Sequence, residues 1–151
     1  MQKIKISTAQ FENKSGDKDY NLLVIDQLSK KAAMEGSDVI AFHECSVTGY
    51  TFASNLTKEQ MLDLAEIIPE GPSIARLIKI AAKHDITILA GLFEKEKDDS
   101  LYKAYVCVDK NGLIAKHRKL HPFINPHLTP GNSYTVFEIH GWKCGILICY
   151  D

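Results

Sequence analysis

The chain has 151 residues, of which 45% are hydrophobic and 25% charged, and this composition is that of a folded domain rather than a disordered segment. Its 18 basic and 19 acidic residues leave a formal charge of -1, so no overall field favours nucleic acid or an anionic membrane. We therefore expect small molecules or further subunits as partners.

The amino terminus, Met1 to Ile6, alternates polar and apolar residues and leaves no room for the apolar core of a secretory signal. No apolar run approaches the length of a membrane span. Cysteines at positions 45, 107, 144 and 149 lack the short paired spacing of a zinc or redox motif. These features predict a cytoplasmic protein with free thiols and no membrane segment.

The first part of the chain predicts a strand, a helix and a second strand. Lys3–Gln10 alternates as a half-buried strand does, and Tyr20–Glu35 places its apolar residues on one helical stripe. Val39–Phe42 is a continuous apolar run, typical of a strand covered on both faces, and His43 and Glu44 follow it directly.

Two more helices are predicted in the middle of the chain. Thr57 is suited to cap a short helix over Glu59–Ile67, with Glu59 and Gln60 near the capping-box position. The spacing of Ile74, Leu77, Ile78 and Ala81 predicts a further helix, and Pro72 suits its first turn.

The second half predicts mainly strands, one hairpin and one long ordered loop rich in proline. The strands are Ile86–Phe93, Leu101–Asp109, Leu113–Lys116 after an Asn111-Gly112 turn, Tyr134–Ile139 and Lys143–Cys149, with the loop at Leu120–Ser133. Strands flanked by amphipathic helices, followed by a run of strands, predict the α/β class with a mixed sheet.

Three residues at predicted strand ends suggest a catalytic group. Cys149 would be a nucleophile, Glu44 a general base and Lys119 a cationic partner for an oxyanion. Each residue taken alone also has a structural explanation: a core cysteine, a solvated loop glutamate and part of a basic surface cluster. The convergence of strand ends at one sheet edge would bring the three together.

The remaining cysteines are interpreted as structural. Cys107 and Cys144 lie inside predicted strands, and Cys45 points away from its neighbour Glu44 on an extended chain. A Cys-His hydrolase stays open as an alternative, because any of four histidines could activate Cys149: His43, His117, His121 or His127. No metal site is expected, since Pro122 argues against a helix that would align His117 with His121, and no Gly-rich phosphate loop is present.

Three segments together resemble the nitrilase superfamily of carbon-nitrogen hydrolases: Phe42–Tyr50, His117–His121 and Gly145–Asp151. The resemblance implies an α-β-β-α sandwich that forms homo-oligomers, and a Glu44-Lys119-Cys149 triad with the backbone N–H of Tyr150 in the oxyanion site. It implies hydrolysis of a small amide, carbamoyl compound or nitrile through a cysteine thioester, with no cofactor.

Two departures and one difference in length accompany this resemblance. Many family members carry a further glutamate in the loop after the lysine, whereas Pro122–Pro130 has no carboxylate, and His43 stands where proline is common. Family members also continue well beyond the cysteine strand, so residues 1–151 are interpreted as the amino-terminal portion of the domain, with an incomplete sandwich that we expect to self-associate. The alternative functions are a non-catalytic α/β interaction module and a truncated, inactive fragment.

Overall fold

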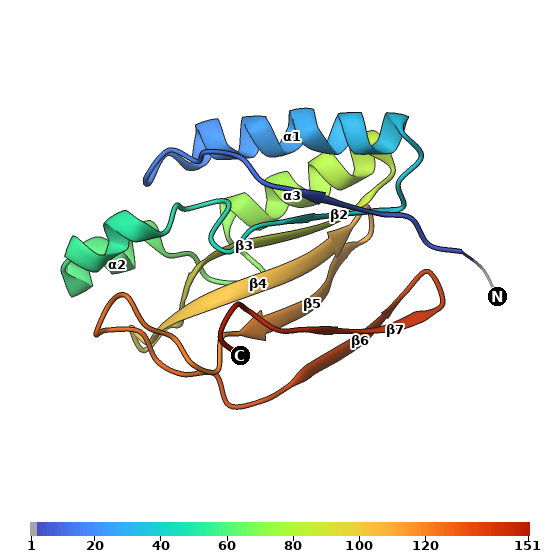
Figure 1. The fold of residues 1–151 in the computed structure, drawn as a ribbon. Helices are drawn as coiled ribbons and strands as arrows, with labels where there is room; N and C mark the ends of the chain where they lie inside the picture. Colours follow the sequence, from blue (N-terminus) through green and yellow to red (C-terminus); the bar gives the residue numbers. More distant parts are fainter. Residues whose placement is uncertain (1–2) are drawn as a thin grey trace.

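The computed structural model describes residues 3–151, which form a five-stranded mixed sheet between a helical layer and a two-stranded hairpin (Figure 1). The helices are α1 (Lys18–Met34), α2 (Lys58–Leu64) and α3 (Pro72–His84), with a 3-10 turn at Thr51–Asn55. The sheet has the order β1 (Ile6–Ala9), β2 (Val39–Phe42), β3 (Thr87–Lys95), β4 (Leu101–Asp109), β5 (Gly112–Arg118), and the hairpin consists of β6 (Thr135–Ile139) and β7 (Trp142–Ile146).

The directions of the strands bring the ends of several strands to one edge of the sheet. Strands β1, β2 and β3 are parallel, β4 is antiparallel to β3, and β5 is antiparallel to β4. The carboxyl ends of β2 and β5 therefore lie at the same edge as the amino end of β4. This edge receives Glu44, Lys119 and the first residues of β4.

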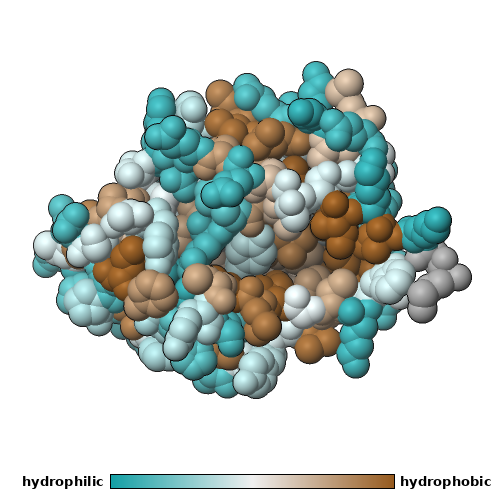
Figure 2. Space-filling model, in the orientation of Figure 1, coloured by the Kyte–Doolittle hydropathy of each residue, from teal (hydrophilic) through white to brown (hydrophobic). Residues whose placement is uncertain are grey.

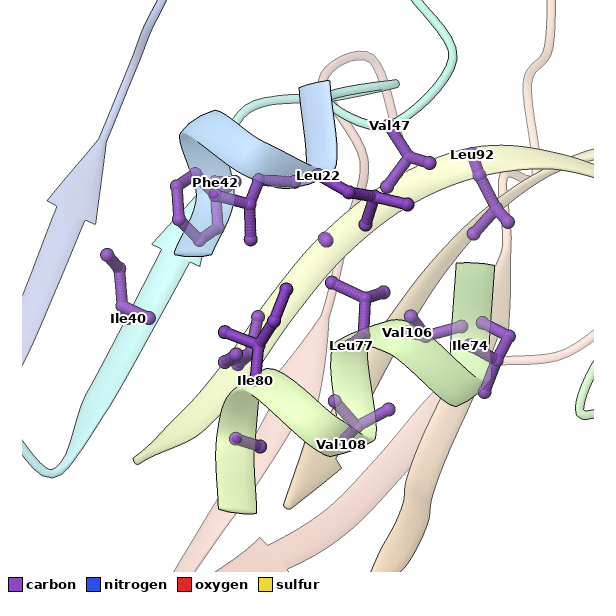
Figure 3. Packing of buried hydrophobic residues seen from close by; sticks show 14 of the residues in the cluster. Leu22, Ile40, Phe42, Val47, Ile74, Leu77, Ile80, Leu92, Val106 and Val108 are labelled. Atoms are coloured by element: carbon purple, nitrogen blue, oxygen red, sulfur yellow. The ribbon is translucent and has the colours of Figure 1, made fainter. Parts of the chain in front are cut away.

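Two apolar clusters cover the two faces of the sheet. On the helical face, Leu22 of α1 and Leu77 of α3 pack on Ile40, Leu92 and Val106 of the sheet (Figure 3). On the other face, residues of the β6–β7 hairpin and of the segment after it pack against the sheet; this cluster contains Val39, Cys107, Ala115, Ile139, Ile146 and Ile148. The predicted α/β class is confirmed, and the described residues form the α-β-β layers of the sandwich.

The surface retains apolar area beside these layers. On the face shown in Figure 2, apolar residues gather between the helical layer and the β6–β7 hairpin. Large apolar side chains exposed on the protein include Ile6, Val136 and Leu147. Within residues 3–151, no helix combines the length and the apolar character that a membrane crossing requires.

The capping box predicted at Thr57 is confirmed, since its hydroxyl accepts from the Gln60 N–H and the Gln60 side chain accepts from the Thr57 N–H. Helix α2 nevertheless ends at Leu64, not at the predicted Ile67. The reason is long-range: Glu66 leaves the helix to bridge β3, where its N–H donates to Phe93 O and its carbonyl accepts from Lys95 N.

Two strand predictions were too long. The first strand pairs with β2 only over Ile6–Ala9, which is shorter than the predicted Lys3–Gln10. The last strand was predicted to reach Cys149, but its ladder with β6 ends at the pair Thr135 and Ile146. Cys149 therefore lies in a turn beyond the strand, because the residues after Ile146 have no strand partner and fold back instead.

Gly91 of β3 allows the segment after β2 to approach the sheet. A Cβ atom at this position would lie 2.5 Å from the backbone nitrogen of Cys45. The close approach is held by hydrogen bonds from Val47 N to Gly91 O at 3.0 Å and from Gly91 N to Ser46 Oγ at 3.3 Å. Glu44 precedes this contact directly, so Gly91 helps to set the position of its backbone.

We predict that Gly91→Ala lowers the free energy of unfolding by about 1–3 kcal/mol, the usual cost of overpacking a buried site. Gly145→Ala is the matched control, because a Cβ there would meet only Thr135 O at 3.5 Å. Urea unfolding of both variants measures the effect. Equal stability of the two would show that the Cys45 segment is not held against β3.

Candidate active site

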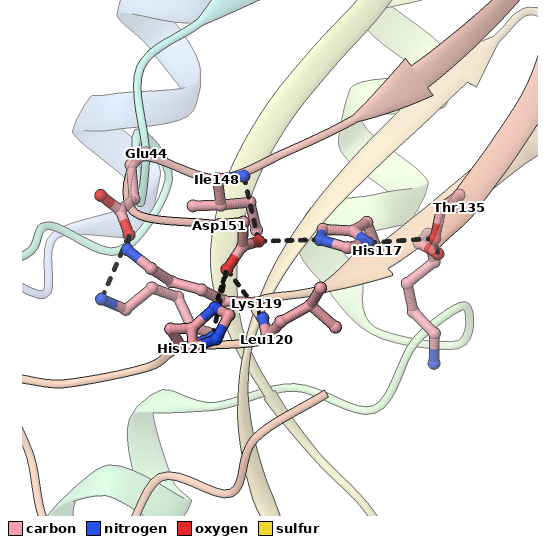
Figure 4. Close-up of polar contacts among 10 residues, drawn as sticks. Glu44, His117, Lys119, Leu120, His121, Thr135, Ile148 and Asp151 are labelled. Atoms are coloured by element: carbon pink, nitrogen blue, oxygen red, sulfur yellow. Dashed lines mark hydrogen bonds and ion pairs between the residues drawn. The ribbon is translucent and has the colours of Figure 1, made fainter. Parts of the chain in front are cut away.

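Glu44 and Lys119 meet at the sheet edge although 75 positions separate them in the chain. Glu44 follows β2 and Lys119 follows β5, and Lys119 Nζ donates to Glu44 Oε1 over 2.7 Å (Figure 4). The Lys119 side chain has no exposed surface, whereas the Glu44 side chain is 21% exposed. The structure thus places together two of the residues that the sequence selected, with Glu44 as the partner open to solvent.

A second lysine, Lys103, lies on the same carboxylate. Its Nζ is 3.2 Å from Glu44 Oε1, its side chain has no exposed surface, and its backbone carbonyl accepts from Lys119 N over 2.8 Å. Burial lowers the pKa of Lys103, and the negative charge of Glu44 opposes this shift. The sequence analysis missed this residue; the available signal was a single lysine within the largely apolar strand Leu101–Val108.

Aromatic rings surround the two ammonium groups. Lys103 Nζ lies 4.1 Å from the ring centroid of Tyr50, and Lys119 Nζ lies 4.9 Å from that of Phe123, distances at which a cation is attracted to a ring face. Burial raises the pKa of Tyr50 to about 12, and the charges of Glu44, Cys45 and Cys149 act in the same direction. The Tyr50 ring thus lies against the lysine that contacts Glu44.

Cys149 lies in a tight turn with an uncommon backbone conformation. Its φ is 52°, in the left-handed region that costs a residue with a Cβ roughly 1–3 kcal/mol. The turn is closed by Asp151, whose N–H donates to Ile148 O over 3.1 Å and whose Oδ2 accepts from Ile148 N over 3.1 Å. Cys149 is exposed and lies beyond the end of β7 at Ile146, so the expectation of a strand that reaches this thiol was wrong.

The same Asp151 carboxylate joins the Cys149 turn to the lysine segment (Figure 4). Its Oδ1 accepts from the backbone N–H groups of Leu120 and His121 at 2.9 and 3.1 Å, and its Oδ2 contacts His117 Nε2 at 2.9 Å. Burial raises the pKa of Asp151, but the hydrogen bonds from His117 and from the backbone outweigh it and lower the pKa. Sequence reasoning missed this residue, for which the signal was a carboxylate two positions after the cysteine.

His117, which contacts Asp151 Oδ2, has a partner on each of its two ring nitrogens. His117 Nδ1 lies 3.1 Å from Thr135 Oγ1, and Nε2 is on Asp151. The side chain is fully buried. His117 therefore holds the turn through Asp151 and is not available as a base for Cys149.

The other histidines named for a Cys-His hydrolase also have different surroundings. His43 packs edge-on against Phe11, with ring centroids 5.0 Å apart, and burial lowers its pKa. His121 lies edge-on to the exposed ring of Tyr150, at 6.0 Å, and His127 is exposed. Within residues 3–151, none of the contacts made by these histidines involves Cys149.

The other cysteines lie in packed surroundings. Cys45 and Cys107 are fully buried, and burial raises the pKa of each thiol to about 12. Cys144 is partly buried against the cluster that includes Ile146. The chain described here contains no group of three or more His, Cys, Asp or Glu side chains that could hold a metal ion.

A surface cavity of about 430 Å³ lies elsewhere, beside Ile68, Glu94 and Lys116. Glu94 is buried there and is neutralised by Lys116 at 2.5 Å and by two hydrogen bonds from Arg118. The charge of Glu94 is thus neutralised within the protein. Neither Glu44 nor Cys149 lines this cavity.

Comparison with known protein families matches residues 5–151 to the carbon-nitrogen hydrolase family. The chain belongs to this family. It is 32% identical over 151 residues to a nitrilase of Pyrococcus abyssi, covering 98% of this chain and 56% of that protein. It is 33% identical over 163 residues to omega-amidase NIT2 of Xenopus tropicalis, covering 100% of this chain and 56% of that protein.

Two solved structures share the fold. Nit3 of Saccharomyces cerevisiae, a nitrilase-superfamily member, matches with a TM-score of 0.82 at 27% identity, over 97% of this chain and 55% of that one. An amidase from Nesterenkonia sp. matches with a TM-score of 0.78 at 20% identity, over 97% of this chain and 56% of that one. The chain thus spans about half the length of these relatives.

We predict that Asp151→Asn destabilises the hydrolase fold by roughly 2–4 kcal/mol at pH 7, because several charge-assisted hydrogen bonds are weakened together. The pKa of Asp151 is lowered by folding, so its contribution is complete above the unfolded pKa of about 4 and is lost as the pH falls through the folded value.

Urea unfolding of the wild type and of Asp151→Asn at several pH values tests this. The difference in free energy of unfolding should be largest above pH 4 and shrink on acidification. Asp63→Asn, an exposed substitution on α2, should cost less than about 0.5 kcal/mol. A difference that is constant with pH would contradict the assignment.

Proposed function

We propose that the protein hydrolyses a non-peptide C–N bond in a small amide, carbamoyl compound or nitrile through a thioester on Cys149. The observation that supports this most strongly is the buried Lys119 ammonium at 2.7 Å from Glu44 Oε1, beside the turn that carries Cys149. A carboxylate in contact with a cation, and a thiol on a turn that Asp151 joins to the lysine segment, are the groups that acyl transfer needs for proton movement, charge stabilisation and nucleophilic attack.

In the proposed first half-reaction, Glu44 accepts the thiol proton and the Cys149 sulfur attacks the amide carbon. The tetrahedral intermediate carries a negative oxygen, which Lys119 and the backbone N–H of Tyr150 stabilise. The C–N bond breaks as the nitrogen takes the proton from Glu44, and ammonia or an amine leaves. A thioester remains on Cys149.

In the second half-reaction, Glu44 removes a proton from water, and the resulting hydroxide attacks the thioester carbon. Collapse of this second tetrahedral intermediate breaks the C–S bond and releases the carboxylic acid, while the proton returns to sulfur. The turn geometry supports this role, since Cys149 is exposed while Cys45 and Cys107 are buried.

The relatives support amides and nitriles as the substrate class, because they include a nitrilase and an omega-amidase at 32% and 33% identity. We favour an amide or carbamoyl substrate over a nitrile. Release of ammonia from a panel of short primary amides, carbamoyl compounds and nitriles, with protein expressed from its complete gene, tests the proposal. Failure to turn over any member while Cys149 remains intact would favour a binding role.

We predict that Cys149→Ala abolishes ammonia release without loss of stability, because the thioester cannot form. Cys107→Ala is the matched control: it should keep activity and lower the free energy of unfolding by about 1–2 kcal/mol through lost packing. The same panel and urea unfolding provide both measurements. Activity retained by Cys149→Ala would end the nucleophile assignment.

We also predict that Lys119→Met reduces kcat at least ~10²-fold, the scale of removing one oxyanion donor. The introduced methionine side chain fills much the same space as the buried lysine stem, so the loss of rate reports on the ammonium group. Lys110→Met is the control, because Lys110 is exposed and pairs with the exposed Asp85. An unchanged kcat in Lys119→Met would reduce the Lys119–Glu44 pair to a structural role.

A further inference from the structure

The carboxylate of Glu44 is contacted by more positive charge than it can neutralise. Lys119 Nζ lies 2.7 Å and Lys103 Nζ 3.2 Å from the same oxygen, Oε1, and neither lysine side chain has any exposed surface. Lys119 makes a hydrogen bond to this oxygen. Lys103 does not have the geometry for one, and its Nζ has no hydrogen-bond partner in the described chain.

Such an arrangement lowers the stability of the fold, so its presence suggests a role in function. A buried ammonium without hydrogen bonds carries a desolvation penalty that an apolar side chain of the same size would avoid. The rings of Tyr50 and Phe123, at 4.1 and 5.4 Å from Lys103 Nζ, recover only part of it. At Glu94, by contrast, both cations make hydrogen bonds to the carboxylate, and Arg118 also pairs with a second carboxylate, Glu96.

We propose that Lys103 is a positioning residue that acts on the nucleophile through Glu44. The proposal rests on the function proposed above for Glu44 as the base of Cys149. With both lysines on Oε1, the carboxylate is fixed by one oxygen, and Oε2 is left to receive the proton of the Cys149 thiol. The excess positive charge also suits a site in which negative charge appears on sulfur and then on oxygen.

The strand order explains why Lys103 can do this. It is the third residue of β4, whose amino end lies at the same sheet edge as the carboxyl ends of β2 and β5. The hydrogen bond from Lys119 N to Lys103 O ties the two lysine backbones together at 2.8 Å. Movement of either lysine relative to Glu44 is thus limited by the sheet itself.

A double-mutant cycle on the rate of Cys149 alkylation tests the proposal without requiring turnover. The protein expressed from its complete gene is treated with iodoacetamide as wild type, Lys103→Met, Glu44→Gln and the double variant, and labelling of the Cys149 peptide is followed by mass spectrometry. We expect Lys103→Met to slow alkylation roughly tenfold, and to change the rate less than about twofold when Glu44 is already Gln.

Lys116→Met is the matched control, since it removes another lysine from a buried glutamate and should leave the Cys149 rate unchanged. Lys103→Arg, which retains a charge, should recover most of the wild-type rate, and labelling of the buried Cys45 and Cys107 reports any unfolding. An unchanged rate in Lys103→Met, or equal slowing in both Glu44 backgrounds, would overturn the proposal. A cycle that behaves as expected in a protein without amidase activity would instead reject the proposed function and leave the role of Lys103 intact.

Discussion

The ammonium group of Lys119 has no contact with solvent, and its position depends on one oxygen atom of Glu44. Removing one partner of such a pair leaves an uncompensated buried charge, at a cost of about 3–5 kcal/mol. The pair therefore constrains the strands that carry it, because β2 and β5 must end at the same edge for the two side chains to meet. Lys103 adds to this constraint by placing a second cation on the same oxygen.

The sheet meets that constraint through its strand order and through the glycine at position 91. Two parallel crossovers place β1, β2 and β3 in one direction, and the hairpin β4–β5 returns the chain so that β5 runs the same way. Gly91 then lets the segment after β2 lie directly on β3. Without that approach, the backbone of Glu44 would be displaced from the two lysines, even though every element remained in place.

The turn that carries Cys149 is held by the side chain of Asp151. Asp151 closes the turn around Cys149 and also accepts hydrogen bonds from the residues that follow Lys119. A left-handed residue with a Cβ persists only where its surroundings over-determine it, and this buried carboxylate supplies that support. The two halves of the proposed chemistry, the nucleophile and its cationic partner, are thus connected by a group that takes no part in bond breaking.

The sequence by itself determined the α/β class, most of the helices and strands, and the candidates Glu44, Lys119 and Cys149, because periodicity, capping residues and short motifs are local signals. It did not reveal Lys103 or Asp151, nor that β7 ends before Cys149. Lys103 is one lysine among many until strand order buries it beside Glu44, and Asp151 is an ordinary acid until chain segments that are distant in sequence present their N–H groups to it. Only the tertiary structure decided these points, because burial and long-range hydrogen bonds depend on which segments become neighbours, and local sequence does not encode that.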